Sequence, residues 1–205
     1  MAVLPAVPPA ASLAVLRAYA PEAALVRGGI NALLPHKIYN LGIPDILADH
    51  GLGAARFTGW RYILRSPDGE YRVVEIAEDS ATGQHAFVAF NSGGHVDAFV
   101  ATHERISASA YAAAKDYEIA VLRAPACFVM AAWAGGGGHD GSVLVPLAPV
   151  HSNFEAGREY DAQTFVTTLE TTAREMTKVG RVGRGRPPGG NPLIGDAGGG
   201  PDEGV

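Results

Sequence analysis

Three consecutive stretches of residues 55–90 alternate apolar and polar side chains, and this pattern constrains the fold more than any other feature of the chain. The stretches read ARFTGWRYILRS, YRVVEIAED and HAFVAF, and they are separated by Pro67-Asp68-Gly69 and by Thr82-Gly83. A period of two residues places alternate side chains on opposite faces of a strand. Short connections rich in Pro, Asp and Gly are typical of tight turns. The sequence therefore predicts an antiparallel meander of three strands.

The apolar period changes from two to about 3.6 residues after the meander, which indicates a helix. Ser92 is a suitable N-cap, and the helix is expected to end near Lys115. Its apolar face consists of Val96, Phe99, Val100, Ile106, Ala110 and Tyr111. The segments YEIAVLR and CFVMAAW then predict one strand bent at Pro125 or two strands. Because proline has no N–H for a central ladder, Pro125 should mark an edge, a kink or a connection.

The remaining regular elements are one strand and three helices. SVLVPLAP predicts a further strand, and residues 22–34 predict a helix weakened by two adjacent glycines. A short helix is expected from Pro44 to about His50. The strongest helix begins after Asp161, with the apolar stripe Phe165, Val166, Leu169, Ala173 and Met176. The expected fold class is α+β, an antiparallel sheet of five to six strands with helices packed on one face.

This order of elements, in a small acidic chain, resembles the secretion-chaperone-like fold. That fold includes the small dimeric chaperones of type III secretion and related stress-regulator domains. The resemblance covers topology alone, without a motif of matching residues. It is therefore a fold-level analogy, and it assigns no function.

Composition divides the chain into three parts. Residues 1–20 are expected to form a flexible lead-in, because they contain Pro5, Pro8 and Pro9. Their sequence fits neither a signal peptide nor a membrane span. Residues 21–177 are expected to form a single α+β domain. Residues 178–205 are rich in Gly, Pro and Arg and are expected to be disordered, because they offer almost nothing to bury.

Charge and cysteine content narrow the classes of partner. The formal net charge of -5 disfavours nucleic acid or an anionic membrane as the main partner, so RNA contact is expected only through Arg181, Arg184 and Arg186 of the tail. Charged residues make up 18% of the chain, below the roughly 25% usual for soluble domains, which favours a protein partner for part of the surface. The single Cys127 excludes an internal disulfide and indicates a reducing compartment, the cytoplasm.

No established catalytic motif occurs at a strand-to-helix junction, so neither a cofactor nor a catalytic centre is expected. Cys127 is one candidate nucleophile, with His139 or His151 as base and Asp140 as orienting group. Its neighbours Ala, Phe, Val and Met favour a buried, inert thiol instead. The acids Glu75 and Glu78 show no signal beyond that of solvated carboxylates.

The seven histidines are scattered, and no metal site is expected from them. His95 and His103 are eight residues apart and would lie near one stripe of the expected helix. The loop Gly135–Gly138 joins one expected strand to another. It is therefore interpreted as a hairpin connection with His139 and Asp140 at its tip, and not as a phosphate loop, which leads into a helix.

Aromatic residues of the meander supply the candidate binding residues Trp60, Arg61, Tyr62 and Tyr71. Most aromatic strand residues pack in a core, so an exposed Trp60 beside Arg61 would mark a binding face. The sequence favours a non-enzymatic module that binds a protein or peptide as a homodimer, as a chaperone-like protein or adaptor. The alternative is a small hydrolase or transferase that uses Cys127 or a histidine near Gly135–Gly138.

Overall fold

A computed structural model describes residues 3–19, 34–48, 50–65, 69–109, 117–135 and 141–183 of the 205-residue chain. Its strands are β1 (Val3–Leu4), β2 (Leu34–Asn40), β3 (Arg56–Arg65), β4 (Tyr71–Glu78), β5 (His85–Ser92), β6 (Tyr117–Ala124), β7 (Val129–Ala134), β8 (Val143–Pro146) and β9 (Tyr160–Asp161). Its helices are α1 (Ala10–Tyr19), α3 (Ile43–Leu47), α4 (Gly94–Ser107) and α6 (Ala162–Gly183), with short 3-10 helices η2 (Gly51–Ala54) and η3 (Pro125–Cys127).

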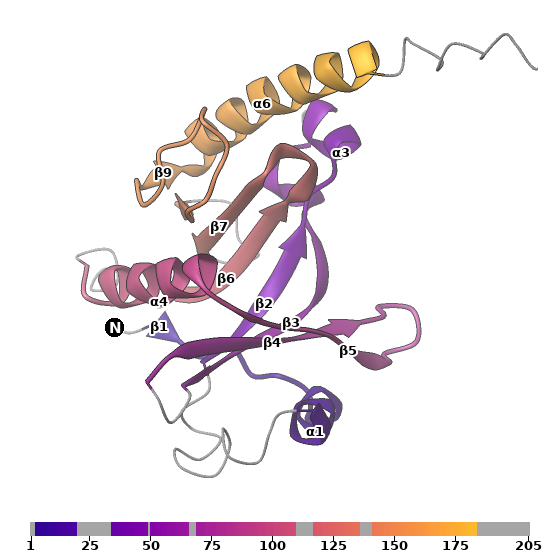
Figure 1. Ribbon diagram of the computed structural model, residues 1–205, viewed down its shortest axis with the longest axis vertical. Coiled ribbons are helices and arrows are strands. Elements are labelled where there is room, and N and C mark those ends of the chain that lie inside the picture. The colour runs from indigo at the N-terminus through magenta and orange to yellow at the C-terminus, as the bar shows by residue number, and fades with distance from the viewer. Residues whose placement is uncertain are drawn as a thin grey trace, which may run out of the picture.

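The strands form one sheet of nine, in the order β5-β4-β3-β2-β6-β7-β8-β9, with β1 paired to β6 (Figure 1). The expected meander is confirmed as β3, β4 and β5, which pair antiparallel. A second antiparallel run, β6 to β9, joins it through the parallel pair β2 and β6. The sheet is thus mostly antiparallel, as expected.

The expectation of five to six strands was too low, mainly because β2 lies in a segment that contains Pro35. Pairing of β2 with β6 begins only at Ile38, so the missing N–H of Pro35 removes no hydrogen bond from that ladder. The two-residue strands β1 and β9 are too short to leave a periodic signal. The segment around Pro125 forms two strands, and η3 is the connection between them, which confirms one of the three roles expected for this proline.

Helices cover both faces of the sheet, which corrects the expectation that they cover one. Figure 1 shows α4 on one side of the strands, with α1 below and α6 above. Strand β6 explains why two covers are needed. Its residues Ile119 and Val121 pack in the core beneath α4, whereas Leu122 packs in the core beneath α6. A strand that is apolar on both faces must be covered on both.

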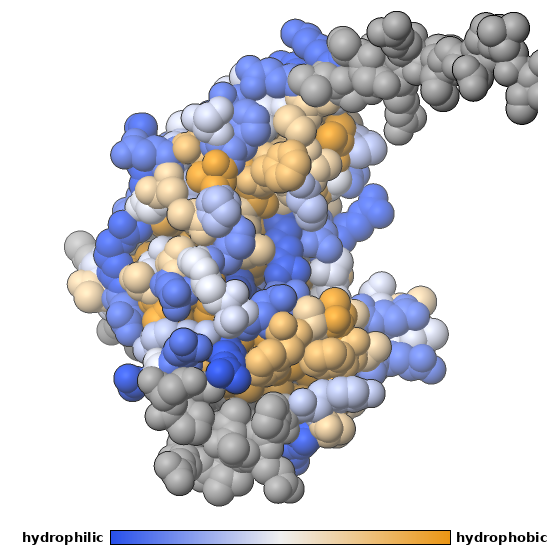
Figure 2. All heavy atoms as spheres, viewed as in Figure 1, coloured by the Kyte–Doolittle hydropathy of each residue, from blue (hydrophilic) through white to orange (hydrophobic). Residues whose placement is uncertain are grey.

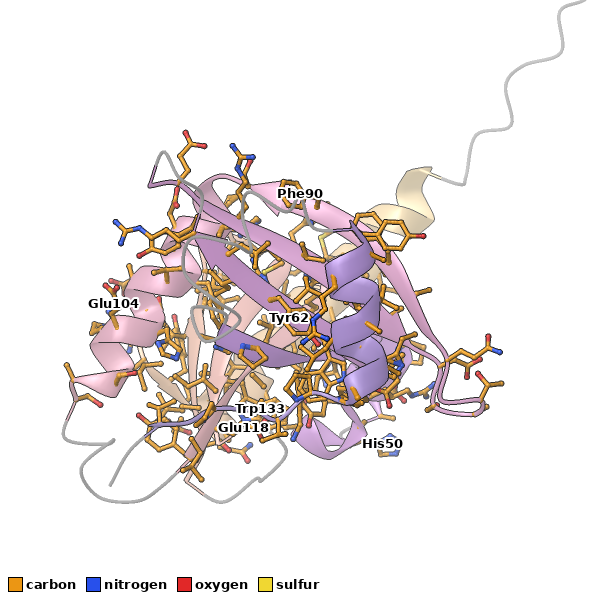
Figure 3. The ribbon with its side chains drawn as sticks, turned by 90° about the horizontal axis from the view of Figure 1, so that it is seen from below. His50, Tyr62, Phe90, Glu104, Glu118 and Trp133 are labelled. Carbon is orange, nitrogen blue, oxygen red and sulfur yellow. The ribbon has the colours of Figure 1, made fainter. Side chains whose placement is uncertain are left out.

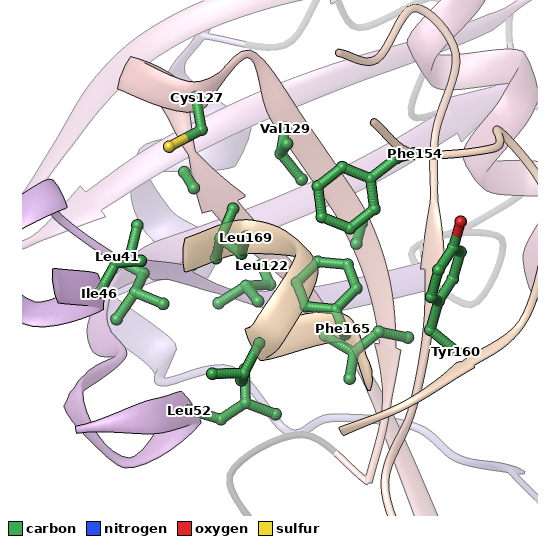
Figure 4. Packing of buried hydrophobic residues seen from close by; sticks show 14 of the residues in the cluster. Leu41, Ile46, Leu52, Leu122, Cys127, Val129, Phe154, Tyr160, Phe165 and Leu169 are labelled. Atoms are coloured by element: carbon green, nitrogen blue, oxygen red, sulfur yellow. The ribbon is translucent and has the colours of Figure 1, made fainter. Parts of the chain in front are cut away.

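Three apolar clusters hold these layers together, one for each helix that covers the sheet. Helix α6 packs Phe165 and Leu169 against β6 to β8 (Figure 4). Helix α4 packs Phe99 and Ile106 on the opposite face. Helix α1 packs Leu16 against the aromatic face of β3 and β4.

The predicted ends of three helices can be compared with the structure. Asp161 caps α6 as expected, since the backbone N–H of Thr164 donates to its Oδ1 at 2.9 Å. Helix α4 begins after Gly93, one residue beyond the expected cap Ser92, and ends at Ser107. The short helix at Pro44 is confirmed as α3. None of the helices in the described ranges is long and apolar enough to span a membrane.

The ends of the chain differ from expectation where the structure describes them. Residues 3–19 contain β1 and α1 instead of an irregular lead-in, and Leu16 is buried. Tyr19 stacks on Phe87 of β5, which anchors the end of α1. Helix α6 continues to Gly183, past the expected domain end at residue 177. Most of the helix expected at 22–34, and residues 184–205 of the expected tail, lie outside the described residues.

Gly59 allows β3 and β4 to approach closely. Its φ is +151°, and a Cβ at this position would lie 2.1 Å from the carbonyl oxygen of Ile76. We expect Gly59→Ala to lower the free energy of unfolding by at least about 2 kcal/mol, because the added methyl group meets backbone. Gly94→Ala is the matched control, since an added Cβ there has no heavy atom within 4 Å. Urea denaturation measures both, and equal stability of the two variants would contradict the prediction.

Candidate functional site

A buried ion cluster links three strands on the α4 side of the sheet. Arg61 of β3 lies directly opposite Glu75 of β4, with 3.9 Å between Nε and the carboxylate oxygen. Arg123 of β6 donates a hydrogen bond from its guanidinium to the same Glu75 oxygen. Side-chain exposure is 2% for Arg61 and 7% for Glu75, against 21% for Arg123. Arg123 is therefore the member of the cluster that reaches the surface.

Arg61 is held in an unusually apolar environment. Its guanidinium lies 5.3 Å from the ring centroid of Phe99, and it donates to the sulfur of Met130 at 3.6 Å. Burial lowers the pKa of Arg61 to about 10, although Glu75 acts in the opposite direction. Arg61 therefore remains a cation at neutral pH.

The cluster carries an excess of positive charge, because two guanidinium groups share one carboxylate. His95 of α4 adds no further charge at neutral pH, since its pKa is lowered, first by burial and then by Arg61 and Arg123. The Nε atoms of Arg61 and Arg123 are buried, and neither has a hydrogen-bond partner in the structure. The site therefore has one positive charge more than its carboxylate balances, and it has N–H donors without a described acceptor.

A pocket of about 410 Å³ opens beside this cluster, within the range of about 300–1,000 Å³ typical of ligand sites. Three polar side chains reach it: Arg123, His95 and His151. Its other lining residues are apolar: Pro125, Phe128, Val129, Met130, Pro149 and Val150. A mainly apolar pocket with a few convergent polar groups is the usual form of a binding site.

Phe128 stands at the turn between β6 and β7 in an unfavourable conformation. Its φ is +53°, in the left-handed region, and the residue is 67% exposed. A non-glycine residue in this region costs about 1–2 kcal/mol, and exposure of the ring recovers little of it. The backbone N–H of His151 donates to the carbonyl of Phe128 and thereby joins the turn to the segment of Pro149, Val150 and His151, which also lines the pocket. Strain of this kind at a pocket favours a role in binding.

The N-terminus of α4 also reaches the pocket, since His95 is the second residue of the helix. The N-cap Gly93 makes no side-chain hydrogen bond to the first turn. Unsatisfied N–H groups give a helix N-terminus partial positive charge. The N–H groups of Val96 and Asp97 donate to the carbonyl of Gly93, and the first turn also contains the acidic Asp97, so Arg123 remains the main positive group at the pocket.

Of the four candidate binding residues, only Arg61 belongs to this site. Trp60 and Tyr62 are buried beneath α1, where Trp60 donates to Glu78 and Tyr62 shares a hydrogen bond with Ser12 (Figure 3). Tyr71 is half-buried at the start of β4, with the Arg65 guanidinium 5.9 Å from its ring. These aromatic residues therefore form no exposed platform.

The candidate catalytic residues do not converge in the described part of the chain. Cys127 lies in the apolar cluster beneath α6, and burial raises the pKa of its thiol (Figure 4). His139 and Asp140 lie outside the described residues, although β7 and β8 do form the hairpin expected around them. His151 lines the pocket, but Cys127 does not.

The other candidate residues are also separate from one another. His103 contacts His36, with ring centroids 5.4 Å apart, whereas His95 faces the pocket. Within the described ranges, no group of three or more His, Cys, Asp or Glu side chains is arranged to hold a metal ion. Arg181 lies in the last turn of α6, and Arg184 and Arg186 lie outside the described residues.

Sequence reasoning missed Glu75 and Arg123 as site residues. Each is a charged residue within an otherwise apolar strand, in VVEIA and in AVLRA. A charge in such a strand is costly unless it is paired, so each needs a partner across the sheet. Comparison of the chain with protein-family models, curated protein sequences and solved structures gave no match. The geometry of the pocket is therefore the basis for a function.

We expect Cys127 to react with iodoacetamide on the order of 100-fold more slowly in the folded protein than in the unfolded chain, because the thiolate is the reactive form and burial disfavours it. Mass spectrometry at neutral pH measures the labelling rate. The same chain unfolded in guanidinium chloride is the control. Labelling of the folded protein at the rate of a free thiol would contradict the prediction.

Proposed function

We propose that this protein is a non-enzymatic module that binds a peptide or a segment of a partner protein. In this proposal, the pocket beside Arg123 receives one large apolar side chain of the partner. The observation that carries the proposal is the pairing of this pocket with Phe128, an exposed aromatic residue held in a strained conformation at its rim. Aromatic and arginine side chains are enriched where protein interfaces gain most of their energy.

The alternative function, a small hydrolase or transferase that uses Cys127 or a histidine near Gly135–Gly138, has less support. A buried thiol with a raised pKa supplies little thiolate at neutral pH. The single, buried Cys127 is also consistent with a cytoplasmic location, which we include in the proposal.

Selection from a displayed peptide library tests the proposal. We expect wild-type protein to enrich peptides that share a large apolar residue, and Phe128→Asp to bind them at least about tenfold more weakly, because one wall of the pocket is lost. Asp tolerates the left-handed region better than Phe, so this variant should fold at least as well as the wild type. Isothermal titration calorimetry with one selected peptide gives the two Kd values.

Val7→Asp is the matched control, because Val7 is 85% exposed and does not line the pocket. It should bind the selected peptide as wild type does. Failure to enrich any peptide, or equal affinity of Phe128→Asp and wild type, would overturn the proposal.

We further propose that the protein forms a homodimer through β5. Among the described strands, β5 stands at the end of the sheet and pairs with β4 alone. Its exposed side chains include Val88, at 56%, and Phe90, at 40%. Figure 2 shows hydrophobic surface at the lower right, where Figure 1 shows β5. Edge strands of monomers usually carry lysine or proline as protection, and β5 has neither. A second copy of β5 is a suitable partner for this edge. The strand contains no Asp, Glu, Lys or Arg, so two copies can pair without repulsion between like charges.

Light scattering during size-exclusion chromatography tests the dimer. We expect the wild type to elute at twice the chain mass of 21.3 kDa, and Val88→Lys to elute at 21.3 kDa, because a charge at the edge opposes strand pairing. Val7→Lys adds the same charge away from β5 and should remain dimeric. A wild-type protein that stays monomeric at every concentration would rule out this interface.

A further inference from the structure

We infer that the pocket recognises a carboxylate carried on a bulky apolar group, with Arg123 as the residue that binds the carboxylate. This inference rests on the proposed function, because both use the same pocket. It adds the chemical class of the ligand, which peptide binding alone does not specify.

The charge balance of the ion cluster is the first argument. Arg61 and Arg123 share the single carboxylate of Glu75, so the cluster as a whole carries one excess positive charge. Arg61 is almost fully buried, whereas Arg123 lines the pocket. Arg123 is therefore the member of this positively charged cluster that a ligand in the pocket would contact. An anion placed there gains a charge-assisted hydrogen bond, which is stronger than a neutral one.

Donor capacity is the second argument. The Nε groups of Arg61 and Arg123 are buried, and no described residue provides an acceptor for either of them. The first turn of α4 lacks a side-chain cap and begins beside the pocket at His95. Buried donors without acceptors are costly and rare in folded proteins. The Nε atoms themselves are enclosed, so an anion in the pocket would contact the exposed part of the Arg123 side chain, which is 21% exposed.

The lining of the pocket selects among anions. Its remaining residues are mainly apolar, and they include Pro125, Phe128, Val129, Pro149 and Val150. A phosphate group carries about two negative charges and a large hydration shell, which neither the single excess charge nor the apolar lining matches. A carboxylate carries one charge, and an attached aromatic or branched group would fill the apolar part. The pocket therefore fits an apolar carboxylic acid better than a phosphate.

Two sources can supply this chemistry, the C-terminal residue of a peptide and a free apolar acid. Both contain a carboxylate next to a bulky hydrophobic group. Titrations with peptides and with small acids distinguish the two sources.

The first arm compares ligands that differ only in charge. We expect 3-phenylpropanoate to bind the full chain with a Kd of about 1 mM, the range for a ligand of this size. The neutral 3-phenylpropanamide should bind at least about tenfold more weakly, because it loses the charge-assisted hydrogen bond. Ligand-observed NMR measures both. Equal binding of acid and amide would overturn the inference and leave the proposed peptide binding intact.

The second arm identifies the source of the carboxylate. The peptide acetyl-Gly-Gly-Gly-Phe is titrated with a free C-terminus and with a C-terminal amide. Tighter binding of the free-acid peptide than of 3-phenylpropanoate supports a peptide C-terminus as the ligand. Binding of 3-phenylpropanoate without binding of the peptide supports a free acid, and it counts against the peptide as partner.

The third arm tests Arg123 directly. Arg123→Met should reduce the preference for acid over amide to within about twofold, and Arg123→Lys should restore part of it. Arg174→Met is the control, because this arginine is exposed on α6 and pairs with Glu170. A full preference in a folded Arg123→Met protein would overturn the inference. If that variant does not fold, the comparison of acid and amide on the wild type still tests whether the pocket prefers a carboxylate.

The two proposals fail in different ways. Selected peptides that bind equally well as acids and amides, with no binding of 3-phenylpropanoate, would overturn the carboxylate inference alone. A preference for the acid without any selected peptide would overturn the peptide-binding proposal and support a small-acid ligand.

Discussion

The ion cluster of Arg61, Glu75 and Arg123 is the constraint on which the arrangement of the site depends. One carboxylate on β4 pairs with a guanidinium on β3 and with another on β6, so the two antiparallel runs of the sheet are joined by ion pairs as well as by the parallel pair β2 and β6. Removing one partner of a buried ion pair typically costs about 3–5 kcal/mol. Because two of the three charges are positive, the cluster produces a positive electrostatic potential, and the pocket opens beside it.

Packing around the cluster explains why this potential reaches a ligand. Helix α4 covers Arg61 through Phe99, and Arg61 is almost fully buried, whereas Arg123 lines the pocket. The same helix contributes its N-terminus beside His95, where burial and the two arginines keep the imidazole neutral. A protein that packed only apolar residues on this face would be as compact but would have no polarity in its pocket. The charged residues Arg61, Glu75 and Arg123, which are costly to bury, are thus the ones that give the pocket its charge.

Much of the fold could be predicted from local patterns, and most of the site could not. The meander, the hairpin around Gly135–Gly138 and the cap at Asp161 each depend on neighbouring residues, so their signals are local. Strand β2 was missed because it contains Pro35 and because its parallel pairing with β6 joins segments about 80 residues apart. The pocket depends on the same kind of long-range contact. Its residues come from α4, β6, β7 and the segment before His151, and nothing in one strand predicts the others.

The inferred ligand depends on one arrangement, in which an ion cluster with one excess positive charge meets an apolar pocket at Arg123. A crystal structure of the full chain grown with 3-phenylpropanoate tests it most directly. We expect the carboxylate within about 3 Å of the Arg123 guanidinium and the phenyl ring against the apolar residues that line the pocket. A phenyl ring in the pocket with its carboxylate turned to solvent, or a ligand bound elsewhere, would contradict it.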